Sequence, residues 1–319
     1  MPARPAIWTG RRCGAISWYE EGPVHPRSQE TTNVTIVAEK PFTHRTSGPP
    51  PVLQRARGVG AIGTAQRDGT TILATLYQDG CAKIRLPKTH CATLEAVLIN
   101  TAGGLTGGDI MQWSADVVPG GHMVLTTQAC ERIYRSIGGA ATVTTRLSVG
   151  AGAHLDWLPQ ETILFAASQL DRRIEVDLDA GASLTAVEAI LLGRDAMGEA
   201  AMDARLRDQW RIRRNGRLIH AEATRLDGTI AERDGLSLLD GSRAMATILH
   251  VAPDADACAA ALTRLRQALP KTGRVAASAT GERLVIRALA ETGLALRRLI
   301  VPILAELSGA SALPRLWHL

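Results

Sequence analysis

Residues 119–127 read PGGHMVLTT, a glycine turn followed by a run of apolar and β-branched residues. The same order returns in residues 150–158 (GAGAHLDWL) and 179–187 (DAGASLTAV), with the turn glycines 31 and 29 residues apart at Gly121, Gly152 and Gly181. Each glycine is followed three positions later by an apolar residue: Val124, Leu155 and Leu184. Because a unit repeated at about thirty residues buries its apolar face only against its neighbours, the spacing predicts stacked, β-helix-like coils. Hairpins of a β-sandwich are the alternative, since they also turn at glycine.

A β-hairpin is predicted after these coils. Residues 208–214 and 217–224 flank an Asn-Gly dipeptide. This dipeptide is the strongest short signal for a hairpin, because both of its residues must adopt a positive φ. In a regular hairpin Ile219 falls opposite Ile212.

The last part of the chain has helical rather than strand-like spacing. Apolar residues recur at helical intervals in residues 254–269, where Asp254 is placed to cap the first turn. Residues 292–307 have the same spacing, and Pro302 either kinks this second helix or is confined to a late turn. The predicted fold is therefore mainly β, with stacked coils or a sandwich and two α-helices near the C-terminus.

The first 54 residues differ from the rest of the chain. They hold eight of the fifteen prolines and show little apolar periodicity. We expect residues 1–54 to be a disordered N-terminal extension or the product of a start placed too early. Residues 55–319 are expected to form the β domain with its C-terminal helices.

Composition and charge narrow the classes of function. The net charge is +5, but Lys and Arg are spread along the chain, so nucleic-acid binding is not expected. Residues 1–14 lack the apolar core of a secretory signal, and the apolar run at 299–305 is too short to span a bilayer, so no membrane association is expected. Five cysteines without a C-x-x-C pair favour neither disulfides nor a structural zinc site. These features predict a cytoplasmic protein.

The segment NTAGGLTGGD, residues 100–109, has the glycine density of a phosphate-binding loop. A P-loop requires a Lys after its last glycine, whereas here Asp109 follows and would repel phosphate. No helical spacing follows either, as a dinucleotide-binding loop would require. We interpret the glycines as permitting a tight, buried crossing of the backbone.

Acidic residues recur at the ends of predicted strands and loops: Asp109, Glu131, Asp156, Glu161, Glu188, Asp195 and Glu199. If several face a common interior, they could pass a divalent cation, because carboxylates and water hold such ions loosely. Alternatively they are surface groups paired with nearby arginines. None of the eight histidines forms an i, i+4 pair, so no tight metal site is indicated. Cys130 is interpreted as a small buried residue rather than a nucleophile.

Six segments in this order resemble the UreD family of urease accessory proteins. They are NTAGGLTGGD (100–109), TTQACERIYRS (126–136), WLPQETILF (157–165), GRDAMGE (193–199), DQWRIRRNGRLIHAE (208–222) and LPRLW (313–317). The similarity runs from about Gln54 to the C-terminus, and residues 1–54 have no counterpart in it. One departure is that the family often has Lys where Glu131 or Arg132 falls.

The resemblance implies a non-enzymatic nickel-insertion factor, a chaperone of metallocentre assembly built of β-helix-like coils with helices near the end. The implied partners are the apo-urease subunits and the accessory protein UreF, which recruits UreG, the GTPase that carries nickel. An internal water-filled tunnel would pass Ni²⁺ in transit, with no tightly bound cofactor. The acidic residues then become candidates for a transient nickel path: Asp109, Glu131, Asp156, Glu161 and Glu188.

Two other functions are compatible with the residues alone. The first is a β-solenoid hydrolase that uses a carboxylate pair such as Asp156 and Glu161 for acid–base catalysis. The second is a structural binding module without a metal path.

Overall fold

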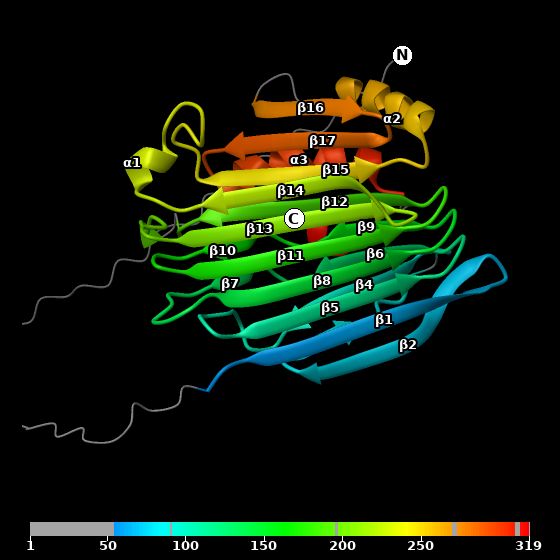
Figure 1. Cartoon of the computed structure of the whole chain (residues 1–319), viewed down its shortest axis with the longest axis horizontal. Helices are drawn as coiled ribbons and strands as arrows, with labels where there is room; N and C mark the ends of the chain where they lie inside the picture. Colours follow the sequence, from blue (N-terminus) through cyan, green and yellow to red (C-terminus); the bar gives the residue numbers. More distant parts are fainter. Residues whose placement is uncertain (1–53, 90, 195–196, 270–272, 310–312, 319) are drawn as a thin grey trace, which may run out of the picture. The chain divides into compact units, whose positions relative to one another are not determined.

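The computed structural model describes residues 54–318, except residues 90, 195–196, 270–272 and 310–312. The expectation of an extension at residues 1–54 falls on positions outside this range, save for Gln54, and stays a prediction. Within the described range two sheets pack face to face through a shared apolar core, and two longer helices cover the outer face of one sheet (Figure 1).

The seven-stranded sheet, called sheet A, presents one face to solvent. Its spatial order is β14 (Arg217–Leu226), β13 (Arg205–Arg214), β11 (Gln169–Leu178), β8 (Ala141–Val149), β5 (Ile110–Val117), β1 (Arg57–Arg67) and β2 (Thr70–Gly80). Buried and exposed residues alternate along β11 and β13, as expected of strands with one wet face.

The second sheet, called sheet B, has ten strands. Its main order is β16 (Arg274–Thr280), β17 (Arg283–Ala290), β15 (Ala244–Val251), β12 (Ser183–Leu192), β9 (His154–Leu158), β6 (His122–Thr127), β4 (Leu94–Asn100) and β3 (Ala82–Arg85). Two short strands, β7 (Glu131–Ile133) and β10 (Thr162–Leu164), pair in parallel beside the end of β12. Nearly every residue of β12 is buried, because both of its faces are covered.

The chain passes back and forth between the sheets, which confirms the predicted stacked coils. In sheet A, strands β5, β8, β11 and β13 stack in parallel. In sheet B, strands β4, β6, β9 and β12 do the same. Each coil therefore contributes one long strand to each sheet and buries its apolar face against the coils on either side.

The glycine turns stack as well, with one correction to the predicted alignment. Residues His122 and His154 are paired across β6 and β9, so the equivalent turn positions are Gly120, Gly152 and Gly181. These three glycines have φ values of 69°, 65° and 67°, whereas Gly121 has no positive φ. Backbone hydrogen bonds join successive turns, from Gly120 N–H to the Ala151 carbonyl (2.9 Å) and from Gly152 N–H to the Ala180 carbonyl (3.0 Å).

Replacing Gly152 with Ala is expected to lower the free energy of unfolding by about 1–2 kcal/mol, because an L-residue is strained at this positive φ. No atom lies within 4 Å of the added Cβ, so the loss reports backbone conformation alone. Gly138→Ala is the matched control, since its Cβ site is also open and its φ is not positive. Chemical denaturation of both variants checks this, and equal losses at the two positions would contradict it.

The hairpin and the two C-terminal helices form where the sequence predicts them. Strands β13 and β14 meet at the Asn-Gly turn, but a bulge after Ile212 pairs that residue with His220, so the predicted pairing with Ile219 is wrong. Helix α2 (Ala255–Ala268) begins at the Asp254 cap, and α3 (Gly293–Leu307) contains Pro302. A four-residue helix, α1 (Ile230–Arg233), and a 3-10 turn at Arg315–Trp317 were not predicted.

Helices α2 and α3 cover the outer face of sheet B. Helix α3 lies against β12, β15 and β17, and its buried side chains include Ile300 and Leu304. They join an apolar cluster with Leu158 and Val187, which point outward from sheet B. Sheet B is thus the middle layer, with one apolar core on each side.

Segment 100–109 crosses from β4 in sheet B to β5 in sheet A. This agrees with the tight backbone crossing that its glycines predict. A Cβ at Gly104 would meet the Arg132 carbonyl oxygen at 2.7 Å, and one at Gly107 would meet the carbonyl oxygens of Gly138 and Gly139 at 2.5 Å. The close contact of two chain segments therefore requires glycine here. A strand follows the segment, which agrees with the absence of a nucleotide-binding loop.

Candidate functional site

Two of the predicted carboxylates, Glu131 and Glu188, line one small cavity between the sheets. Its volume is about 50 Å³, and residues from both sheets surround it, among them Arg172, Trp157 and Val143. A space of this size holds a water molecule where polar partners are present.

Glu131 also lines a second hollow beside this cavity. An outer pocket of about 160 Å³ is lined by Asn100, Cys130 and Glu131. The two hollows share three lining residues: Trp113, Thr127 and Glu131. Glu131 therefore lines both the outer pocket and the inner cavity.

The environment of Glu131 disfavours its charge. Burial raises the pKa of Glu131 to about 7, although the side-chain amide of Asn100 opposes this by donating to both carboxylate oxygens, at 3.0 and 3.2 Å. No described Lys or Arg forms an ion pair with it. A buried carboxyl group with a raised pKa lowers the stability of the fold when it is ionised. Its presence therefore makes Glu131 a candidate functional residue.

Glu188 lies deeper, at the centre of β12. Its carboxylate accepts hydrogen bonds from Trp157 Nε1, at 3.0 Å, and from Arg172 Nη1. The same guanidinium donates to Asp208 from Nε at 3.1 Å and from Nη2 at 2.8 Å. Burial and the neighbouring charge of Asp208 raise the pKa of Glu188, against the attraction of Arg172. The buried Arg172 guanidinium is thus the shared counterion of two buried carboxylates, Glu188 and Asp208.

Glu161 is bound by Arg297 of helix α3 and does not line the cavity. Arg297 Nη1 donates to Glu161 Oε1 at 3.2 Å and to Gln160 Oε1 at 2.8 Å. The thiol of Cys130 donates to Glu161 Oε2 at 3.4 Å. Burial and the charge of Glu161 raise the pKa of Cys130 to about 11, so this cysteine is a thiol at neutral pH and a poor nucleophile.

Asp156 is fully buried on the outer face of sheet B. Its Oδ1 lies 2.9 Å from His154 Nε2, and its Oδ2 lies 3.3 Å from His122 Nε2. Ser308 Oγ, just beyond α3, donates to Oδ2 at 2.8 Å. Burial opposes ionisation, but the charge of His154 and the hydrogen bonds from both imidazoles and Ser308 hold the pKa of Asp156 below its ordinary value.

The remaining predicted carboxylates lie apart from the cavity. Asp109 caps the glycine segment, because its two oxygens accept from the backbone N–H groups of Ala56 and Thr106, each at 2.8 Å. Glu199 pairs with Arg194. Asp195 lies outside the described residues. Of the five main candidates, the structure brings only Glu131 and Glu188 to one cavity.

The pair suggested for a hydrolase is not assembled. Among the described residues, Asp156 bonds to two histidines and a serine, whereas Glu161 bonds to Arg297 and Cys130. The two carboxylates share no partner through which one could act as acid and the other as base.

The histidine grouping was missed from the sequence, because the i, i+4 criterion applies to helices. In stacked coils the relevant spacing is one coil, which places His122 directly beside His154. His122 and His154 each follow the turn glycine of their coil, Gly120 and Gly152, by two positions. The repeat in the sequence therefore indicated that the two histidines lie side by side.

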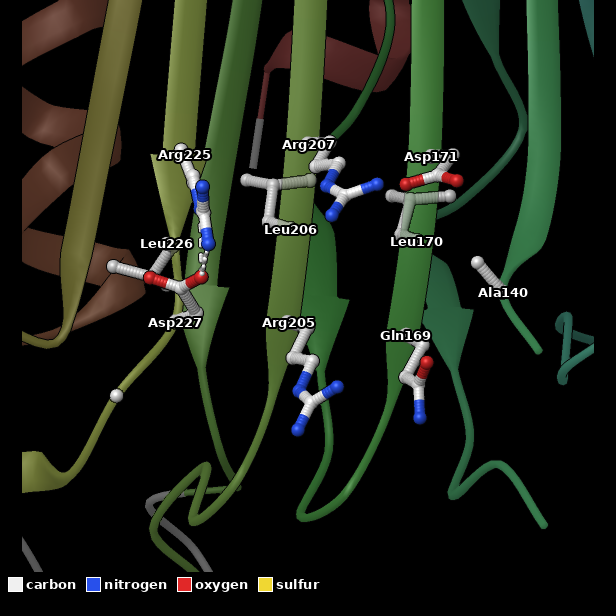
Figure 2. Close-up of a pocket in the computed structure, with 11 residues that line it drawn as sticks. Ala140, Gln169, Leu170, Asp171, Arg205, Leu206, Arg207, Arg225, Leu226 and Asp227 are labelled. Atoms are coloured by element: carbon white, nitrogen blue, oxygen red, sulfur yellow. Dashed lines mark hydrogen bonds and ion pairs between the residues drawn. The ribbon is translucent and has the colours of Figure 1, made fainter. Parts of the chain in front are cut away.

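A larger hollow, of about 580 Å³, lies at the edge of sheet A and is lined by none of the predicted carboxylates. Figure 2 shows the side chains of Arg205 and Arg207 on β13, which are in register with Gln169 and Asp171 on β11. This hollow shares only Leu170 with the lining of the cavity of Glu131 and Glu188. None of the described helices is both long and apolar enough to cross a membrane.

The model of the UreD urease accessory protein family matches residues 56–318. The urease accessory protein UreD of Chelativorans sp. strain BNC1 is 59% identical over 270 residues, covering 85% of this chain and 96% of that protein. The UreD proteins of Rhizobium etli and Sinorhizobium medicae are 49% and 46% identical, each covering 83% of this chain and 96% and 97% of their own length. A match of this extent spans both sheets and the C-terminal helices, and the chain belongs to the UreD family of urease accessory proteins.

Proposed function

We propose that this chain is a non-enzymatic factor of urease maturation that passes Ni²⁺ to the urease active site. We infer the process, urease maturation, from the similarity of this chain to proteins named urease accessory proteins. The proposed partners are the apo-urease subunits, UreF, and the GTPase UreG as the source of nickel. We further propose that these steps take place in the cytoplasm and that no cofactor is tightly bound.

The observation that carries the nickel path is Glu131, which lines both the outer pocket and the inner cavity. Its carboxylate accepts hydrogen bonds from the neutral Asn100 amide and has no ion pair with a described Lys or Arg, so no paired cationic side chain opposes the approach of a metal ion. Glu188 lines the same cavity but is neutralised by Arg172. An ion entering at Glu131 therefore meets first a carboxylate without an ion pair and then Glu188, which already shares the Arg172 guanidinium with Asp208. Such a path holds an ion loosely, as transfer requires.

The test is a Glu131→Leu variant coexpressed with urease and the other accessory proteins. Leu keeps the side chain's bulk and removes the metal-binding oxygens. We expect the nickel content of the recovered urease to fall by about tenfold, the loss typical when a group supporting a metal site is removed. Nickel is measured by elemental analysis, and urease activity should fall in parallel.

Glu175→Leu is the matched control, because Glu175 lies on the outer face of sheet A, where it pairs with Arg146. Pull-down of urease and UreF by both variants shows whether the complex still forms. Normal nickel content with Glu131→Leu would overturn the nickel path. Intact complex formation together with normal activation would favour a purely structural binding module.

A further inference from the structure

Two imidazoles and a carboxylate converge where β6 and β9 begin. His122 and His154 are the first residues of these strands and are register partners. Asp156 follows His154 by two residues, so it lies on the same face of the sheet. One ligand atom from each of the three lies within 4.8 Å of the others. This arrangement is at the opposite end of β9 from Glu161.

The distances suit a transition-metal ion. Ligand atoms at about 2.0–2.1 Å from a tetrahedral ion lie about 3.3 Å from one another. The distances from Asp156 to His154 Nε2 and to His122 Nε2 are 2.9 and 3.3 Å. Only small movements of the side chains would therefore place an ion between them.

The second ring nitrogen of each histidine is also engaged. Thr93 Oγ1 lies 3.1 Å from His122 Nδ1, and Ser183 Oγ lies 2.6 Å from His154 Nδ1. Hydrogen bonds of this kind fix the orientation of a ligating imidazole and direct the other nitrogen to the metal. Both Nε2 atoms consequently face the Asp156 carboxylate.

Asp156 differs from the buried glutamates in its ion-pair partners. Glu161 and Glu188 each form an ion pair with a buried arginine. Asp156 has an exposed fraction of 0%, and within the described range its ion-pair partners are only the two histidines. A buried carboxylate is stable when a cation compensates it, and a metal ion is one such cation.

We propose that His122, His154 and Asp156 form a binding site for one divalent transition-metal ion, Ni²⁺ or Zn²⁺. Two imidazoles and one carboxylate suit these ions, whereas Mg²⁺ and Ca²⁺ require mostly oxygen ligands. Three protein ligands leave coordination positions to water, so the ion can exchange. Only the choice of Ni²⁺ as the physiological occupant rests on the proposed function.

The site also joins separate parts of the fold. Ser308 Oγ donates to Asp156, and the backbone N–H of Gly309, which lies 3.3 Å from His154 Nε2, would give way to an ion at that nitrogen. An ion bound here is linked to β6, β9 and the segment that follows α3. Because the metal would bind the folded chain better than the unfolded chain, it should raise the melting temperature in a concentration-dependent way.

The experiment uses the full chain, freed of metal with a chelator and dialysed against Ni²⁺, Zn²⁺ or Mg²⁺. We expect the wild type to bind one more equivalent of Ni²⁺ and of Zn²⁺ than the double variant His122→Ala/His154→Ala, and no such excess of Mg²⁺. The matched control is His318→Ala, whose ring faces the Leu313 carbonyl and which should bind as the wild type does. X-ray absorption of the wild-type complex should show two imidazole ligands that the double variant lacks.

Equal stoichiometry and affinity in the wild type and the double variant would overturn the proposal. So would an absorption spectrum of the wild-type complex without imidazole ligands, a result that does not depend on any variant folding. Equal binding of Mg²⁺ would overturn it as well. The measurements involve no urease, so their failure leaves the role of Glu131 standing. Failure of the Glu131 experiment likewise leaves this site to be judged by its own metal binding.

Discussion

Arg172→Met is expected to lower the free energy of unfolding by about 3–5 kcal/mol, the loss typical when one partner of a buried ion pair is removed. The Arg172 side chain is 6% exposed, and its guanidinium donates to Glu188, Asp208 and Thr162. Without it, two carboxylates are left buried in one place with no cation. Urea denaturation at neutral pH measures the change.

The control is Arg173→Met on the exposed face of the same strand, which is expected to change stability by less than about 0.5 kcal/mol. Adding Glu188→Gln and Asp208→Asn to the Arg172→Met variant should recover most of the loss, because the uncharged groups no longer require a counterion. A loss below about 1 kcal/mol in the single variant would show that the carboxylates do not depend on Arg172.

Glu131→Gln is expected to stabilise the metal-free chain at pH 8 by roughly 1–3 kcal/mol, and by much less at pH 5. Burial raises the pKa of Glu131 from 4.5 to about 7, so the folded state holds a proton that the unfolded state has released. The wild type therefore keeps its full stability below about pH 4.5 and loses part of it as pH rises to 7. Gln carries no charge and avoids that loss.

Thermal or urea unfolding of both proteins across this pH range, with a chelator present, measures the difference. The stability gap between Glu131→Gln and the wild type should widen from pH 5 to pH 8. Glu175→Gln, at the outer face of sheet A, corrects for the removal of one negative charge. A gap that stays constant with pH would mean that Glu131 is ionised throughout, and its burial would need another explanation.

The stacked coils were predictable because their repeat is visible along the sequence: one coil takes about thirty residues, and its turn needs glycine. The turn alignment was off by one residue because Gly120 and Gly121 are adjacent and only backbone conformation distinguishes them. The pairing of Ile212 failed for a related reason. A bulge shifts the register by one, and no residue type marks it.

The candidate site was less predictable. Strand β12 is buried on both faces, so alternation along it does not show that Glu188 points into the cavity. The partners of the carboxylates come from distant segments, as with Arg297 and Glu161, which are 136 residues apart. Composition can supply candidate acids, but which of them line the cavity and which pair with an arginine depends on tertiary packing.

The two outer strands of sheet A determine what its edges present to a second copy of the chain. The parallel ladder from β1 to β13 is flanked by β2 at one end and by β14 at the other, and both run antiparallel to their neighbours. A second copy of the chain that approached either edge would meet a strand of opposite direction, and it could not continue the parallel ladder. Arg217 on β14 adds positive charge to that edge. Sheet A therefore does not offer a copy of itself the parallel edge by which an uncapped solenoid could be extended.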